Sequence, residues 1–156
     1  MFRCGTALRA SILLVALGFA AWPEAAGAQV RAGVRGGVSI DPDQVYVGGH
    51  VETAPLVDRL TFRPNVEVGF GDDVTLAAFN FEFAYHFAAR TSRVPWHFYA
   101  GGGPAANFFS ANGNSDTSAG FNFLFGAERR DGLFFEAKLG AGDSPSLKFG
   151  VGYTFH

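Results

Sequence analysis

The chain has little cysteine, no excess of positive charge and no long apolar run, and each shortage excludes a class of protein. Cys4 is the only cysteine among 156 residues. Disulfide frameworks and cysteine-ligated metal centres need several thiols, so neither is expected. The formal net charge of −2 provides no basic footprint for nucleic acid. The apolar run Ser11–Ala21 is too short to cross a bilayer as a helix.

The first thirty residues have the organisation of a secretory signal peptide. Two arginines precede the apolar run, and a proline and small residues up to Ala28 follow it. This order is typical of a cleaved leader. We expect residues 1–28 to be a signal peptide and residues 29–156 to form one domain; a transmembrane anchor is the alternative. Cleavage removes Cys4 and leaves 10 basic and 13 acidic residues of the original 12 and 14, a net charge near −3.

Aromatic residues occupy every second position of Phe79–Phe87, whose sequence is FNFEFAYHF. A period of two predicts a strand with two chemically different faces. Clusters of Gly, Pro, Asn and Asp, which favour turns, divide the chain after residue 29 into eight segments of strand length. The expected strands are residues 30–40, 46–54, 60–70, 75–87, 96–108, 118–129, 133–142 and 147–155.

Parity places most phenylalanines on one face of these strands. Fourteen of the sixteen Phe residues beyond residue 28 lie there with many valines, and Phe109 and Phe134 do not. The opposite face carries Gly, Asn, His and charged residues. A small eight-stranded barrel has too little interior for so many rings, whereas apolar-out, polar-in strands are typical of membrane barrels. We therefore predict an all-β, eight-stranded antiparallel up-and-down transmembrane β-barrel; a soluble lipocalin-like barrel is the alternative.

Two stretches have the form of known barrel motifs. Residues 95–108, PWHFYAGGGPAANF, contain a Tyr-x-Gly-Gly-Gly strand. The last ten residues, LKFGVGYTFH, follow the pattern polar-x-Gly-x-x-aromatic-x-aromatic. The residues that fit this second pattern are Lys148, Gly150, Tyr153 and Phe155. His156 follows the last aromatic, whereas the pattern usually ends on the aromatic itself.

On these motifs the chain resembles the small eight-stranded outer-membrane barrels of the outer membrane protein A and X type, including the opacity-related proteins. The resemblance implies a monomer in the bacterial outer membrane, in contact with outer-membrane lipid and lipopolysaccharide. It also implies that the terminal pattern is the assembly signal that the barrel-insertion machinery reads. Such motifs specify the architecture much better than the activity.

The charges on the inward face balance, with five of each sign. The basic residues are Arg31, Arg35, Arg63, Lys138 and Lys148, and the acidic ones are Glu52, Glu67, Glu82, Glu128 and Glu136. Enclosed charges are tolerated when they are paired and hydrogen-bonded. The balance therefore predicts a salt-bridge network that plugs the lumen. The alternative, proposed for relatives of this type, is a gate whose pairs exchange to pass small ions.

The aspartates lie in or beside the expected turns, where their short side chains bond local backbone. With both termini periplasmic, the outer loops would carry six Asp and no Lys or Arg. These expected outer loops are residues 41–45, 71–74, 109–117 and 143–146. A solubilising rim is the simpler interpretation, and divalent-cation bridging to lipopolysaccharide is the other.

No catalytic or cofactor-binding pattern emerges. Lipid A deacylases of this architecture carry a His-x-Ser element, but no Ser lies within three residues after any internal His. The spacing of His50, His86 and His97 specifies no metal site. We expect a non-enzymatic protein without cofactor, with an envelope structural or small-solute or ligand-interacting role. The alternatives are a lipid A-modifying enzyme and a narrow ion channel.

Overall fold

The computed structural model describes residues 29–72, 74–88 and 93–156, and the expected signal peptide, residues 1–28, lies outside them. No helix in the described residues is long and apolar enough to cross a membrane. The described chain forms eight strands: β1 (Arg31–Ile40), β2 (Gln44–Glu52), β3 (Leu60–Phe70), β4 (Thr75–His86), β5 (Trp96–Ala111), β6 (Asn114–Arg129), β7 (Leu133–Gly142) and β8 (Leu147–Thr154).

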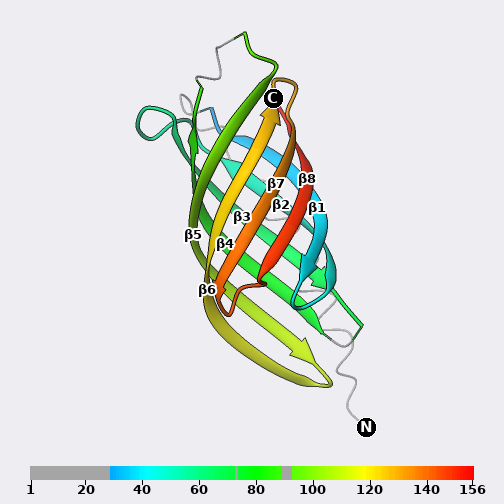
Figure 1. Ribbon diagram of the computed structural model, residues 1–156. Helices are drawn as coiled ribbons and strands as arrows, with labels where there is room; N and C mark the ends of the chain where they lie inside the picture. Colours follow the sequence, from blue (N-terminus) through cyan, green and yellow to red (C-terminus); the bar gives the residue numbers. More distant parts are fainter. Residues whose placement is uncertain (1–28, 73, 89–92) are drawn as a thin grey trace.

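These strands close into a single antiparallel barrel (Figure 1). Each strand pairs with the next along the chain, and β8 pairs back with β1, so that Gly33 lies opposite Thr154. Closure gives every strand two neighbours, which satisfies the backbone groups that an open sheet would expose at its edges. The predicted all-β, eight-stranded up-and-down topology is confirmed.

The barrel has two distinct ends. The start of β1 and the C-terminus lie together at one end, at the top of Figure 1, which we call the terminal end. The described connections at this end are residues 53–59, 87–88 with 93–95, and 130–132. The opposite end, which we call the far end, carries the turns at residues 41–43, 71–72 with 74, 112–113 and 143–146.

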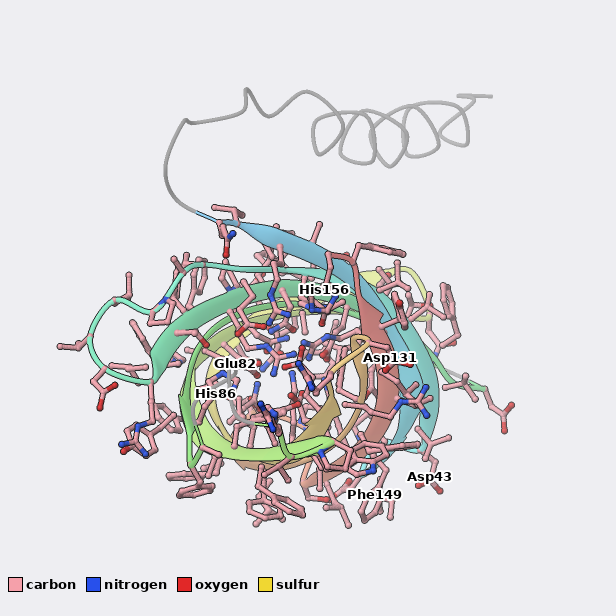
Figure 2. The ribbon with its side chains drawn as sticks, turned by 90° about the horizontal axis from the view of Figure 1, so that it is seen from above. Asp43, Glu82, His86, Asp131, Phe149 and His156 are labelled. Atoms are coloured by element: carbon pink, nitrogen blue, oxygen red, sulfur yellow. The ribbon has the colours of Figure 1, made fainter. Side chains whose placement is uncertain are left out.

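The two faces of the strands differ as parity predicts. None of the fourteen phenylalanines assigned to the outer face is buried, and Phe81, in the middle of β4, is 48% exposed. Asn80 and Glu82, its neighbours in the chain, are buried inside the barrel. Figure 2 shows rings such as that of Phe149 outside the barrel, and Glu82 and His86 inside. An apolar surface this continuous is the lipid-facing surface of a membrane barrel.

The Tyr-x-Gly-Gly-Gly strand owes two of its glycines to close strand packing. A Cβ atom on Gly101 would overlap the carbonyl oxygen of Phe83, and one on Gly103 would overlap that of Phe81. Both oxygens belong to β4, the neighbour of β5. Only glycine fits a backbone approached this closely. These glycines of the motif therefore reflect the close approach of β4 and β5 in the barrel wall.

The prediction of an outer loop at residues 109–117 is wrong. β5 continues to Ala111 and β6 begins at Asn114, so each strand has 16 residues and only Asn112 and Gly113 form the turn. Both turn residues have positive φ, 49° and 81°. Asn-Gly is the preferred pair for a two-residue hairpin because both positions need positive φ. The hairpin projects beyond the other strands at the far end (Figure 1).

The sidedness of β4 gives a first prediction. Phe81→Arg should lower the free energy of unfolding by about 2–4 kcal/mol in lipid bilayers, the cost of an arginine near the membrane midplane. Phe70→Arg is the matched control, because Phe70 is 56% exposed but ends β3 beside the far-end turn. Its cost should be about 0–1 kcal/mol. Denaturant titration of refolded protein in vesicles measures both, and equal costs would contradict the membrane placement.

Candidate functional site: the charged barrel interior

All ten charged residues singled out in the sequence lie inside the barrel, where Figure 2 shows nitrogen and oxygen atoms concentrated. Nine are buried and Arg31, near the terminal end, is half-buried. The structure joins them through ion pairs into one connected network, which we call the lumen network. Its members are Arg31, Arg35, Glu52, Arg63, Glu67, Glu82, Glu128, Glu136, Lys138 and Lys148.

Glu67 on β3 is one centre of the lumen network. Its carboxylate lies 2.7 Å from Lys148 Nζ, 2.9 Å from Lys138 Nζ and 3.5 Å from Arg35 Nη1. These cations come from three other strands, β8, β7 and β1. One carboxylate therefore links four strands across the barrel.

Glu136 on β7 is the second centre. Its oxygens lie 2.9 Å from Arg35 Nη1 and 3.4 Å from Arg63 Nη1. The hydroxyl of Tyr99 donates a hydrogen bond of 2.8 Å to the same carboxylate. Lys138 Nζ lies 3.7 Å away and so connects Glu136 to the Glu67 centre.

The lumen network continues to the terminal end. Glu52 lies 3.1 Å from Arg31 and 3.6 Å from Arg63, and it contacts His86 Nε2 at 3.3 Å. Arg31 also pairs with Glu128 at 3.2 Å. The bridging of one carboxylate by two arginines and an imidazole compensates its charge in an enclosed space.

Toward the far end the network merges with a ladder of asparagines that sequence analysis did not single out. Lys138 Nζ lies 2.8 Å from Glu82, and Asn65 donates to Glu82 at 2.7 Å. Asn80 donates to Asn65 and Asn122 donates to Asn80, each at 2.8 Å. The sequence contains the pattern that places these asparagines in the lumen, because all three have inward parity on strands β3, β4 and β6.

Phe134 is a buried ring in this polar interior. Its parity predicts an inward side chain, and the structure agrees, because Phe134 is only 1% exposed. Its ring centre lies 5.4 Å from Arg35 Cζ and 5.1 Å from Arg63 Cζ. Arg63 also lies 4.8 Å from the Tyr99 ring. A desolvated guanidinium is attracted to an aromatic face. These rings therefore stabilise the arginines where carboxylates do not reach every N–H group.

The histidines are held separately. His50 Nε2 lies 3.1 Å from Thr154 Oγ1, His86 contacts Glu52, and His97 Nε2 lies 3.0 Å from the carbonyl oxygen of Val94. Among residues 29–72, 74–88 and 93–156, no group of three or more His, Cys, Asp or Glu side chains is arranged to hold a metal ion.

The residues of the terminal pattern lie in β8 or directly after it and divide between its inward and outward sides. Lys148 and Gly150 point inward, and a Cβ at Gly150 would overlap the hydroxyl of Tyr46. Tyr153 and Phe155 point outward, with ring centres 5.5 Å apart. The backbone of Phe155 also donates to the carbonyl of Ala32 at 2.7 Å, which continues the closure between β8 and β1.

The turns differ in charge as the sequence indicates. Asp41, Asp43, Asp72 and Asp143 lie in or next to the far-end turns, Asp116 lies within β6 near the tip of the projecting hairpin, and Asp73 lies outside the described residues. At the terminal end Arg129 Nε donates to Asp131 at 2.8 Å. This hydrogen bond, from an exposed guanidinium, lowers the pKa of Asp131 to about 2. The turn therefore keeps its ion pair well below neutral pH.

The lumen is filled at the level of the network. Side chains that line a water-filled pore are exposed to the water inside it. Instead Glu52, Arg63, Glu67 and Glu82 are 0–1% exposed. At this level the interior is therefore filled by side chains of both charges.

These features define the class of protein: a closed eight-stranded membrane barrel with an apolar exterior and a polar, filled interior. No protein-family model and no curated protein sequence matches the chain. Its fold is similar to the crystal structure of the N-terminal β-barrel domain of Pseudomonas aeruginosa OprF, with a TM-score of 0.62 and 17% identity over 82% of this chain and 97% of that chain. Neisserial surface protein A is also similar, with a TM-score of 0.59 and 15% identity over 83% and 98%. The chain thus has the fold of the small eight-stranded outer-membrane barrels.

The Glu67 centre generates a stability prediction. Glu67→Ala leaves three buried cations without their shared partner, so the free energy of unfolding should fall by about 3–5 kcal/mol. Asp58→Ala is the control, because Asp58 forms an exposed pair with Arg59 at 3.3 Å, and such pairs contribute about 0–1 kcal/mol. Urea titration followed by tryptophan fluorescence measures both. A Glu67→Ala loss no larger than that of the control would contradict a buried network.

The outward aromatics of β8 generate a prediction about assembly. The Phe155 side chain is 52% exposed on the outside of the barrel, so the Phe155→Ala variant should fold normally in detergent. In cells it should be secreted and then accumulate in the periplasm, because the terminal aromatic is part of the expected insertion signal. Envelope fractionation measures this, with Val151→Ala, an outward residue of β8 at a variable position of the pattern, as the control. Equal outer-membrane yields from both variants would contradict the insertion role.

Proposed function

We propose that this chain is a non-enzymatic protein of the bacterial outer membrane whose barrel is a rigid, plugged scaffold. It has an envelope structural or ligand-interacting role, with its terminal end in the periplasm and its far end outside. The observation that carries the proposal is the lumen network, because a filled interior leaves the surface and the ends of the barrel as the places where function can lie.

The geometry favours a plug over an ion path. Each interior carboxylate of the two centres contacts at least two cations, and Lys138 contacts Glu67, Glu82 and Glu136 together. An ion that passes must separate several of these pairs at once. Shared pairs of this kind are costly to break in a low-dielectric interior. The wild-type barrel is therefore expected to conduct poorly.

The positions of the histidines favour a non-enzymatic role over lipid A modification. A lipid substrate reaches the outer surface of the barrel, whereas His50, His86 and His97 are buried inside it. His50 and His86 are hydrogen-bonded to threonines in the lumen, where a lipid ester has no access. A general base must be within hydrogen-bond reach of the proton it abstracts.

Planar bilayer recording tests the plug. Refolded wild-type protein should be nearly silent, while Lys138→Ala, which removes the cation shared by three carboxylates, should show small conductance steps and a lower unfolding midpoint. Arg59→Ala, at an exposed turn, should behave like the wild type. Steady wild-type conductance at porin levels would contradict the plug and favour a channel.

Mass spectrometry of lipid A from cells with and without the protein tests the non-enzymatic part. The lipid A spectra are expected to be identical. Loss or gain of an acyl chain that depends on the protein would assign it an enzymatic role.

A further inference from the structure

The terminal end of the barrel carries all the outward tyrosine and tryptophan side chains of the described chain. Three of these residues, Tyr85, Trp96 and Tyr153, point outward near this end. The other two after residue 28, Tyr46 and Tyr99, are buried inside the barrel. Tyrosine and tryptophan lie at the level of the lipid headgroups in membrane proteins, because each has an apolar body and a polar tip. The terminal end therefore has an interfacial aromatic belt.

At the far end the outward side chains have no such polar tip. Ile40, Val45, Phe70 and Phe108 lie there, and all four are exposed. The exposed charged side chains near them are the aspartates described above. The two ends of the barrel therefore present different chemistry to the two leaflets of a membrane.

A row of four outward residues crosses neighbouring strands within the aromatic belt. Arg129, the last residue of β6, is exposed and lies opposite Trp96 on β5. On the other side of β6, β7 begins at Leu133, which lies opposite Tyr153 on β8. The row therefore places a guanidinium at the same level as two amphipathic rings.

Two further arginines lie beside this row. The backbone N–H of Arg130 donates to the carbonyl of Pro95 at 3.2 Å, which holds the turn at residues 130–132 against the segment that leads into β5. Arg93 lies two residues before Pro95, and both arginines are exposed. Arg129 is paired with Asp131, whereas Arg93 and Arg130 form no ion pair among the residues that the structure describes. We call this region the terminal patch, with the members Arg93, Trp96, Arg129, Arg130 and Tyr153.

The outward direction of Arg129 indicates the level of the terminal patch in the membrane. An outward arginine is costly at the bilayer midplane and tolerated near the interface. Trp96, which lies opposite Arg129, favours the same interfacial level. The terminal patch therefore lies among the lipid headgroups, which is the level of the lipid phosphates.

We propose that the terminal patch binds the phosphate of an anionic phospholipid, whose acyl chains lie against the outward rings of β5 to β8. Guanidinium groups form charge-assisted, often bidentate hydrogen bonds to phosphate oxygens. The ring of Phe135, with its centre 5.9 Å from that of Trp96, provides apolar surface for the acyl chains. Charge selects the occupant, because a zwitterionic lipid carries a cation of its own that the arginines repel.

This inference concerns the outer wall of the barrel and goes beyond the function proposed above. It does not depend on the state of the lumen. A conducting wild-type lumen would contradict the plug without affecting lipid selection, and absent lipid selection would leave the plug intact.

Trp96 is a built-in reporter for the test. Trp22, the other tryptophan, belongs to the expected signal peptide, so the chain that begins at residue 29 fluoresces from Trp96 alone. Bromine atoms on the acyl chains of a lipid quench tryptophan on contact. The chain is refolded in phosphatidylcholine vesicles that contain a brominated lipid, either phosphatidylglycerol or phosphatidylcholine, over the same range of mole fractions. Both leaflets have the same composition, so the direction of insertion does not affect the result.

The quenching curves give the relative affinity of the two brominated lipids at Trp96. Phosphatidylglycerol should be preferred about fivefold, the effect of about one basic side chain at a charged membrane surface. The preference should largely disappear in about 1 M NaCl, where the screening length is about 3 Å.

A double variant and a matched control test the arginines. Arg93→Gln combined with Arg130→Gln should remove the preference for phosphatidylglycerol and leave the aromatic rings in place. Arg59→Gln is the control, because Arg59 is also at the terminal end but is already paired with Asp58 at 3.3 Å. It should keep the wild-type preference. Unchanged gel migration of unboiled samples establishes that all variants fold.

Several results would overturn the proposal. Equal quenching of the wild type by the two brominated lipids would exclude selection of an anionic headgroup. A preference that survives in the double variant would exclude the terminal patch as its cause. An equal loss in Arg59→Gln would assign the effect to the net charge of the chain, and a preference unchanged in 1 M NaCl would exclude an ionic contact.

Discussion

The structure depends on one constraint, which is that backbone N–H and C=O groups within a membrane must find partners inside the protein. Eight strands meet this constraint only when β8 pairs with β1, from Gly33 opposite Thr154 to Ile40 opposite Leu147. Closure then separates two environments, one of lipid and one of enclosed polar groups. The phenylalanine exterior, the charge-balanced interior and the far-end rim all follow from it.

Polar groups need hydrogen-bond partners both inside the barrel and at the far end, but the partners differ. Inside the barrel the side chains must be paired because water is excluded, and the lumen network links Glu67 and Glu136 to cations on several strands. At the far end the strands leave the membrane and water can satisfy backbone groups. β6 can therefore continue to Asn114 without a partner on its β7 side. The unpaired edge of β6 therefore lies where water can satisfy its backbone groups.

Turn signals predicted the number of strands, and parity predicted their sidedness, because a period of two fixes which face each residue occupies. The contacts inside the barrel were not predictable in this way. Glu82 and Lys138 lie 56 residues apart, and their meeting depends on the stagger of strands around the closed wall. Phe134 was recognised as inward, but its position between two arginines depends on the same stagger. The loop at residues 109–117 was misjudged because its Asp, Ser and Asn composition outweighed the Asn-Gly turn signal at its centre.

The pairing of residues far apart in the sequence makes folding of the barrel cooperative. Lys148, on the last strand, pairs with Glu67, 81 residues earlier, and Arg35, on the first strand, pairs with Glu136, 101 residues later. A half-built sheet therefore holds carboxylates and cations on strands that have not yet met, and in a membrane such a sheet carries uncompensated charge. Partially formed barrels are penalised twice, at their open edges and at their unpaired charges. The chain is thereby biased toward an all-or-none transition, in which the last strand completes the wall and neutralises the interior in one event.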